Sequence, residues 1–253
     1  MVFSVGDEYT ITDIYNEVNM SKHSHWDKVK RAKGAADRAK AIVGSKLLRL
    51  VSSAAKQGGG DPNMNFRLRL AVETAKGSGV TKDAIDRAIA KAVGAGADAE
   101  QLETLLYEAY GPGGVAILIE CLASNRNKAV AEVKHTLTMG NGNMAGEGAV
   151  KWMFQHRGVL RFAKPQNDEF ELKAIDAGAD DVIFEDDGYT VYTNLDNLEK
   201  VKNALGETPE FAGFQWIPKD RIPVPEAEQG NLDALLESLD ELEDVNEVYT
   251  NAE

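Results

Sequence analysis

The stretch YEAYGPGGVAILIECL, residues 107–122, marks the point where helical sequence gives way to strands. Its Gly-Pro-Gly-Gly segment at residues 111–114 has the composition of a tight turn. Apolar runs lie on both sides of this segment, at residues 104–109 and 115–122. Because two apolar runs joined by a glycine-rich turn are typical of a hairpin, we predict two adjacent strands here.

The residues after this hairpin alternate between helical and strand patterns. We expect a helix at residues 127–138, a glycine-rich loop at 140–148 and a strand at 149–154. The order strand, helix, strand then occurs twice in succession, which is the ferredoxin-like arrangement. Its expected strands are residues 158–162, 181–185, 189–193 and 214–217, and its expected helices are residues 169–177 and 197–205.

An acidic helix is expected at residues 231–242, followed by a short strand at 247–249. The leucines of this helix recur at helical spacing, and we interpret them as packing against the chain's own sheet rather than in a partner's groove: Leu232, Leu235, Leu236, Leu239 and Leu242. Because these last elements could complete the sheet that the hairpin begins, the ferredoxin-like unit is expected to be an insertion.

The sequence before the hairpin is helical, with helices predicted at residues 24–55, 65–77 and 81–93. The expected fold class is therefore α+β and multidomain: an N-terminal helical domain followed by two α/β domains, the third (ferredoxin-like βαββαβ) inserted in the second. The expected division is an N-terminal extension at residues 1–19, a basic helical domain at 20–100, a second domain at 101–156 and 218–253, and the inserted domain at 157–217.

Charge is distributed unevenly along the chain, whose formal net charge is −13. Residues 21–91 contain 16 Lys and Arg against 6 Asp and Glu, a net charge of +10. The remaining residues contain 12 Lys and Arg against 35 Asp and Glu, a net charge of −23. A basic segment on an acidic body is typical of local, salt-dependent binding to a polyanion. A merely solvated basic helix face is a weaker interpretation, because few acids are interspersed to form i,i+4 pairs.

Composition excludes several classes of protein. The hydrophobic fraction of 43% and the charged fraction of 27% are ordinary for globular proteins. No run approaches the roughly 20 apolar residues of a membrane helix. Residues 1–17 contain four acids and no Lys or Arg, unlike a secretory or mitochondrial signal.

The single cysteine, Cys121, fits a reducing compartment and is expected to be a small buried residue. We therefore expect a cytoplasmic protein.

Catalytic and cofactor motifs fail the requirements of their mechanisms. Residues 58–62 lack the Lys-Ser/Thr pair of a phosphate-binding loop, and residues 140–148 lack the spacing of a dinucleotide-binding loop. None of the four histidines lies in a motif with enough metal ligands or with a nucleophile: His23, His25, His135 and His156. We expect no enzyme, no cofactor and no metal site.

Polar residues at the start of the helix after the hairpin, Asn125, Arg126 and Asn127, allow two interpretations. They are either a helix cap with a surface arginine, or a site for an anion or a domain interface.

Several motifs occur in a fixed order from Met20 onward. HSHWDKVKRAKGAAD at residues 23–37 and GGGDPNMNFRLR at 58–69 precede YEAYGPGG, and IECLASNRN, EVKH, GNGNMAGEGAV and a strand at Gly158 follow. Together these motifs resemble the YebC/PmpR family of regulatory proteins. The resemblance implies a helical first domain followed by two α/β domains, and a DNA-binding regulator of transcription or a factor acting in translation at the ribosome.

Carried over by position, the resemblance implies nucleic-acid contacts from basic residues of the first domain: Lys28, Lys30, Arg31, Lys33, Lys40, Lys46, Arg67 and Arg69. The chain departs from the family at residues 40–44, KAIVG, where relatives have Arg-Gly-Lys followed by Ile and an aromatic. It also has 19 residues before Met20, where relatives tend to start, so either translation begins at Met20 or this acidic extension masks the basic helix.

Three functions follow from these patterns. The leading one is a nucleic-acid-binding regulator of gene expression, and the alternative is a ribosome-associated translation factor that binds ribosomal RNA. Because no helix shows evident base-reading side chains, phosphate contacts to a structured RNA are favoured on physical grounds. The second alternative is a purely protein-binding adaptor. The oligomeric state is open, with a monomer slightly favoured.

Overall fold

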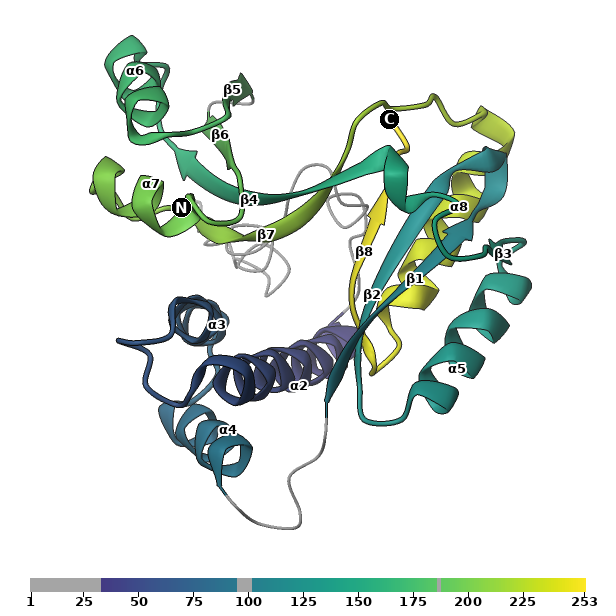
Figure 1. Ribbon diagram of the computed structural model, residues 1–253. Coiled ribbons are helices and arrows are strands. Elements are labelled where there is room, and N and C mark those ends of the chain that lie inside the picture. Colours follow the sequence, from purple (N-terminus) through teal and green to yellow (C-terminus); the bar gives the residue numbers. More distant parts are fainter. Residues whose placement is uncertain (1–32, 95–101, 186–187) are drawn as a thin grey trace, which may run out of the picture.

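The computed structural model describes residues 33–94, 102–185 and 188–253, with side chains from residue 41 onward. The elements form three groups, each with its own apolar core, and the third group is inserted in the second (Figure 1). The first is helical, and the other two each contain a four-stranded sheet. The fold class expected from the sequence is therefore confirmed.

The helical domain consists of α2 (Lys33–Gly58), α3 (Phe66–Gly77) and α4 (Lys82–Val93). Apolar residues at helical spacing on the three helices form one core: Leu47, Val51, Ala55, Leu68, Val72, Ala75 and Ile85. The predicted second and third helices agree with α3 and α4 within a residue, while the predicted start of the first helix at residue 24 lies outside the described residues.

A buried asparagine joins the end of α2 to the start of α3. The Asn65 side chain accepts a hydrogen bond from the Leu68 backbone N–H at 3.1 Å, which caps α3. Its amide donates to the carbonyl oxygens of Ala54 at 2.8 Å and Gly59 at 2.9 Å. One side chain therefore satisfies backbone groups of both helices.

The first sheet has the strand order β3-β1-β2-β8. The predicted hairpin is its centre: β1 and β2 pair antiparallel, and Gly113 and Gly114 adopt left-handed backbone conformations in the turn between them. The strands of this sheet are β1 (Glu103–Tyr110), β2 (Ala116–Ala123), β3 (Asn143–Met144) and β8 (Val245–Thr250). Two helices, α5 (Arg126–Met139) and α8 (Glu226–Asp240), pack on one of its faces.

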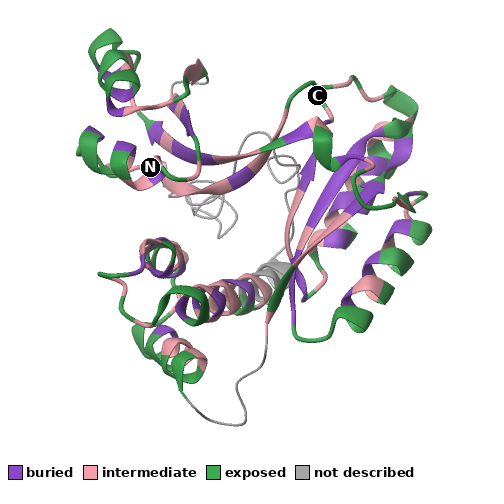
Figure 2. Cartoon of the chain, viewed as in Figure 1, coloured by how far each residue is buried: buried purple, intermediate pink, exposed green. Residues whose placement is uncertain are grey.

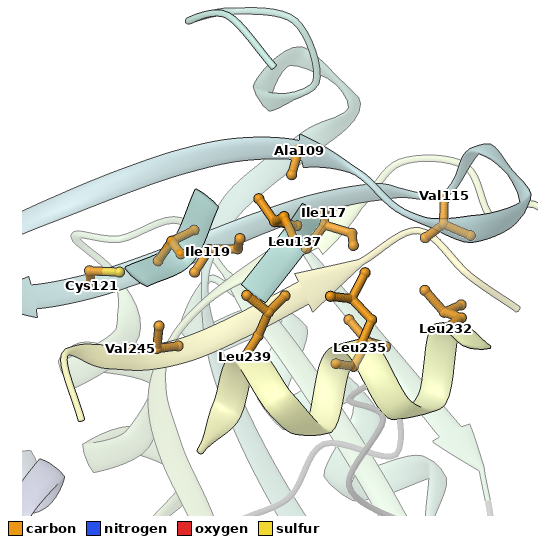
Figure 3. Packing of buried hydrophobic residues seen from close by; sticks show 12 residues of the cluster. Ala109, Val115, Ile117, Ile119, Cys121, Leu137, Leu232, Leu235, Leu239 and Val245 are labelled. Carbon is orange, nitrogen blue, oxygen red and sulfur yellow. The ribbon is translucent and has the colours of Figure 1, made fainter. Parts of the chain in front are cut away.

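The leucine stripe of α8 packs on this sheet, as predicted (Figure 3). Leu235 and Leu239 are about 1% exposed or less and face Ile117 and Ile119 of β2 across the core. The helix begins at Glu226, earlier than the predicted residue 231. Pro225 precedes it, and acids in its first turn favour a helix start.

The second sheet confirms the ferredoxin-like prediction. Its strand order is β5-β6-β4-β7 with every pair antiparallel, and α6 and α7 pack on one face. The elements follow in the order β4 (Phe154–Ala163), α6 (Asp168–Ala177), β5 (Asp181–Glu185), β6 (Gly188–Thr193), α7 (Leu198–Leu205) and β7 (Phe211–Pro218). The chain leaves the first sheet after β3 and returns to it at α8.

The strand predicted at residues 149–154 is wrong. Residues 151–153 form a short 3₁₀ turn, η3 (Lys151–Met153), and one long strand, β4, begins at Phe154. The cause is the buried carboxylate of Glu108 on β1. It accepts hydrogen bonds from the backbone N–H groups of Gly148 at 2.6 Å, Val150 at 2.7 Å and Lys151 at 2.8 Å, which bends the chain. The predicted glycine-rich loop also contains the short strand β3.

A small fourth cluster joins the two sheets. Ala116 and Leu118, on the face of the first sheet opposite α5 and α8, pack with Val150, Phe154 and Tyr249, and Trp216 of β7 lies against them. Purple, buried residues therefore continue from the first sheet into the base of the β4–β7 ribbon (Figure 2).

Candidate nucleic-acid interface

Lys46 on α2, one of the predicted contacts, points at the end of α8. Its Nζ donates to the Asp240 carbonyl oxygen at 2.5 Å and lies 3.2 Å from the Asp240 carboxylate. Only 9% of the side chain is exposed. Lys46 therefore joins the helical domain to the second domain, and a phosphate could reach it only by displacing Asp240.

Arg49, one helical turn further along α2, binds the same acidic segment. Its Nη2 lies 2.6 Å from Oδ1 of Asp244, and its Nη1 donates to the Glu243 carbonyl oxygen at 2.8 Å. Asp244 is buried, and Lys128 of α5 lies 3.7 Å from its other oxygen. Asp244 thus links α2 to α5, because one of its carboxylate oxygens faces Arg49 and the other faces Lys128.

The next predicted contact, Arg69, fastens α3 to α7 of the ferredoxin-like domain. Arg69 forms an ion pair with Glu199 and donates to the Pro62 carbonyl oxygen at 3.1 Å. A second ion pair joins the same two helices, with the base on α7 and the acid on α3: Lys202 lies 2.6 Å from Glu73. Arg69 therefore has a structural partner of its own.

Arg67 lies on the same helix but remains exposed. Its guanidinium carbon lies 5.0 Å from the centroid of the Phe214 ring on β7, within the range of a cation–π contact. Phe66 and Leu70, on either side of it, pack in the core of the ferredoxin-like domain. Arg67 is thus held at the junction of two domains while its charge still faces solvent.

The other predicted contacts cannot be placed. Lys28, Lys30 and Arg31 lie outside the described residues, as do His23 and His25. Lys33 and Lys40 lie on α2, whose described side chains begin at residue 41.

A basic groove between α2 and α4 was missed by the sequence reasoning. Ser45, Arg49, Ser52 and Lys56 recur at intervals of four, three and four residues, so they share one face of α2. Opposite them, α4 presents Lys91 between small alanines. The groove has a volume of about 180 Å³, and the described residues that line it include three basic residues and no Asp or Glu: Ser45, Leu48, Arg49, Ser52, Ser53, Lys56, Ala88, Lys91, Ala92 and Leu102.

The Asn125, Arg126 and Asn127 group lies at the start of α5. The Asn125 side chain accepts a hydrogen bond from the Lys128 backbone N–H at 3.1 Å, so Asn125 is the helix cap. All three residues are exposed, and the Tyr107 hydroxyl donates to the Arg126 carbonyl oxygen at 3.4 Å. An anion at this helix start remains a proposal.

Two family models together match most of the chain. A family model described as the TACO1/YebC protein N-terminal domain matches residues 24–95, and one described as the TACO1/YebC second and third domain matches residues 102–252. The chain belongs to the TACO1/YebC family. The resemblance expected from its motifs is thereby confirmed.

Individual members of the TACO1/YebC family match over nearly their full length. A "Probable transcriptional regulatory protein" of Desulfosudis oleivorans is 41% identical over 92% of this chain and 96% of its own. The "Probable transcriptional regulatory protein YebC" of Shigella flexneri matches to the same extent. The crystal structure of a conserved hypothetical protein, Aq1575, from Aquifex aeolicus superposes with a TM-score of 0.78, at 36% identity, over 91% of this chain and 97% of that one.

Cys121 of this TACO1/YebC chain is a buried core residue, as predicted. Burial, with the nearby charges of Asp244 and Glu120, raises the pKa of its thiol to about 12. Because the thiolate is the reactive form, we expect folded protein at pH 8 to react with a disulfide reagent such as DTNB only as fast as it unfolds. Denatured protein should react at once, and rapid labelling of the folded chain would contradict this assignment.

No group of three or more His, Cys, Asp or Glu side chains is arranged to hold a metal ion within residues 33–94, 102–185 and 188–253. Over these same ranges, no helix has the length and hydrophobicity needed to span a membrane.

Proposed function

We propose that this protein regulates gene expression by binding nucleic acid through its helical domain. The observation that supports the proposal most directly is the basic groove, where Lys56 and Lys91 are exposed and none of the lining residues that the structure describes is a carboxylate. The net charge of +10 over residues 21–91 points the same way, and relatives are named as transcriptional regulatory proteins. The comparisons suggest no catalytic role, and we propose none.

Ribosomal RNA is the target that the geometry favours over promoter DNA. A recognition helix must have a free face that can enter the major groove. The described part of α2 is tied to Asp240 and Asp244, and α3 is packed against α7. A domain that is fixed to its neighbours and contacts phosphates can bind the surface of a folded RNA. Such contacts cannot read the base sequence of duplex DNA.

Charge reversal in the groove tests the proposal. We expect Lys56→Glu with Lys91→Glu to weaken binding to total ribosomal RNA about tenfold or more at low salt. The slope of log affinity against log salt should become shallower, because fewer counterions are released on binding. Filter binding over a salt series measures both quantities.

The matched control reverses two exposed lysines on the other domains, Lys134 on α5 and Lys200 on α7. It changes the net charge of the protein by the same amount but should leave affinity within about twofold. If both double variants bind equally well, the helical domain is not the nucleic-acid interface.

Sedimentation in sucrose gradients separates the candidate functions. A ribosome-associated factor should sediment with ribosomes at low salt and leave them at high salt or after RNase treatment. A DNA-binding regulator should remain at the top of the gradient yet bind duplex DNA in the filter assay. A protein that binds neither nucleic acid would favour the adaptor function.

A further inference from the structure

Two exposed aromatic side chains, Trp152 and Tyr110, meet at the loop between β3 and β4. Trp152 is 63% exposed and Tyr110 is 37% exposed. Among the exposed large hydrophobic residues of the described chain, these two are the aromatic ones, and the other five are aliphatic. The two rings come from different elements, η3 and the end of β1.

Both rings are anchored to the same backbone atom. The Trp152 Nε1–H donates to the Ala149 carbonyl oxygen at 3.0 Å, and the Tyr110 hydroxyl donates to that same oxygen at 3.3 Å. Ala149 is itself held by its N–H, which donates to the Gly146 carbonyl oxygen at 3.1 Å. The rings are therefore oriented before any ligand arrives, which lowers the entropy cost of binding.

The backbone beneath them is fixed by Glu108. Its buried carboxylate accepts three backbone N–H groups, from Gly148, Val150 and Lys151, on both sides of Ala149. A carboxylate that accepts several backbone hydrogen bonds holds a loop strongly, because charge-assisted bonds are the stronger kind. An exposed aromatic on so well-ordered a loop points to recognition rather than to incomplete packing.

Lys151, which precedes Trp152 in the chain, carries a positive charge and lies over a ring of β7. Lys151 is exposed, and its Nζ lies 5.4 Å from the centroid of the Trp216 ring. His156 stacks on Trp216, with ring centroids 4.6 Å apart and an interplanar angle of 12°, and its contact with Phe214 is tilted. Burial lowers the pKa of His156, as do the charges of Arg67 and Lys151, which disfavours its charged form. Three rings, Phe214, His156 and Trp216, therefore lie in a row at the base of β4 and β7, with Arg67 over the first and Lys151 over the last.

We propose that Trp152 and Tyr110 form a stacking platform for an unpaired base of single-stranded nucleic acid, with Lys151 binding the adjacent phosphate. Because the polar hydrogens of both rings are already bonded to Ala149, the platform offers π-faces rather than hydrogen-bond donors. Such a site binds any unpaired base and discriminates against a duplex, whose bases are stacked on one another. This inference rests on the proposed function and names a second contact surface, outside the helical domain.

The test compares single-stranded and duplex binding in the full-length protein. Fluorescence anisotropy with labelled single-stranded oligo(U), oligo(dT) and a blunt RNA duplex of equal length gives three affinities for each variant. Trp152→Ala should weaken binding to both single strands about tenfold, in keeping with the contribution of one stacked base, and leave duplex binding within about twofold. Trp152→Phe, which keeps a ring, should recover most of the loss.

The control variant is Leu172→Ala on α6, because Leu172 has the same 63% exposure as Trp152 and no platform around it. It should bind like the parent protein. Far-UV circular dichroism and thermal unfolding should be unchanged for both alanine variants, since both side chains are at the surface.

The outcomes separate this inference from the proposed function. If Trp152→Ala binds single strands normally while the Lys56 and Lys91 reversal binds weakly, the platform is wrong and the proposed function stands. If neither variant loses affinity, both are wrong. Equal losses on single strands and duplex would also overturn the platform, since stacking of an unpaired base could not explain them. Normal nucleic-acid binding with loss of a protein partner would make the platform a protein-binding site instead.

Discussion

Replacing Glu108 by glutamine is expected to destabilise the folded protein by about 3 kcal/mol at pH 7. The carboxylate is 5% exposed and accepts three backbone N–H groups. Glutamine has nearly the same shape, but its NH₂ group must face at least one of these donors. A buried donor without an acceptor costs about 1 to 3 kcal/mol, and the charge assistance of the other bonds is also lost. Urea unfolding followed by circular dichroism measures the difference.

The effect of Glu108 should depend on pH in a defined direction. Burial alone raises the pKa of this carboxyl, but the three backbone hydrogen bonds and Lys151 outweigh it and hold the pKa below the ordinary 4.5. A depressed pKa stabilises the fold above the unfolded value, and this contribution is lost as the pH falls through the folded value. The stability difference between the parent protein and the Glu108→Gln variant should therefore shrink as the pH falls through the folded pKa of Glu108, which lies below 4.5.

Glu147→Gln is the matched control for this prediction. Glu147 lies in the same loop but is exposed, so its replacement should change the free energy of unfolding by no more than about 0.5 kcal/mol. A Glu108→Gln variant as stable as this control at pH 7 would falsify the role assigned to the carboxylate. Because Glu108 also supports the proposed platform, its loss should weaken single-strand binding in parallel.

Replacing Gly158 by alanine is expected to cost about 1 to 3 kcal/mol, and by valine more. Gly158 lies on β4 between β6 and β7, directly under the first turn of α7. A Cβ there would lie 2.4 Å from Oγ1 of Thr193 and 2.9 Å from Cβ of Leu198. Since Leu198 is completely buried, α7 would have to move away from the sheet. Thermal unfolding of the purified variants measures the loss.

Alanine at a second glycine, Gly230, serves as a control and should change stability in the opposite direction. Gly230 lies inside α8, and a Cβ added to it meets nothing within 4 Å. Gly230→Ala should therefore stabilise the protein by about 0.5 to 1 kcal/mol through helix propensity. Equal effects of the two substitutions would show that close packing at Gly158 is not what requires glycine.

Local sequence patterns predicted the elements whose partners are near them in the chain. The Gly-Pro-Gly-Gly turn predicted the β1–β2 hairpin, and the repeated strand-helix-strand order predicted the ferredoxin-like sheet. The pattern failed at residues 149–154. There the conformation is imposed by Glu108, 40 to 43 residues away, and an alternating pattern contains no information about such a contact.

In the candidate site, too, local sequence predicted some features and distant contacts decided others. Composition located the basic domain, and the predicted contacts were carried over by position from the family resemblance, which does not show whether a cation is already paired. Of these contacts, Lys46 binds Asp240 at the end of α8, and Arg69 binds Glu199. The groove at Lys56 and Lys91 was missed because its two sides belong to different helices.

By itself the sequence determined the family, the fold class and the basic character of the first domain. These depend on residue order, short-range periodicity and charge counts, all of which can be read along the chain. Only the tertiary structure decided which cations face solvent and how the Trp152 loop bends. Both depend on acids between 40 and 195 residues away, and electrostatic pairing is set by distance in space rather than along the chain.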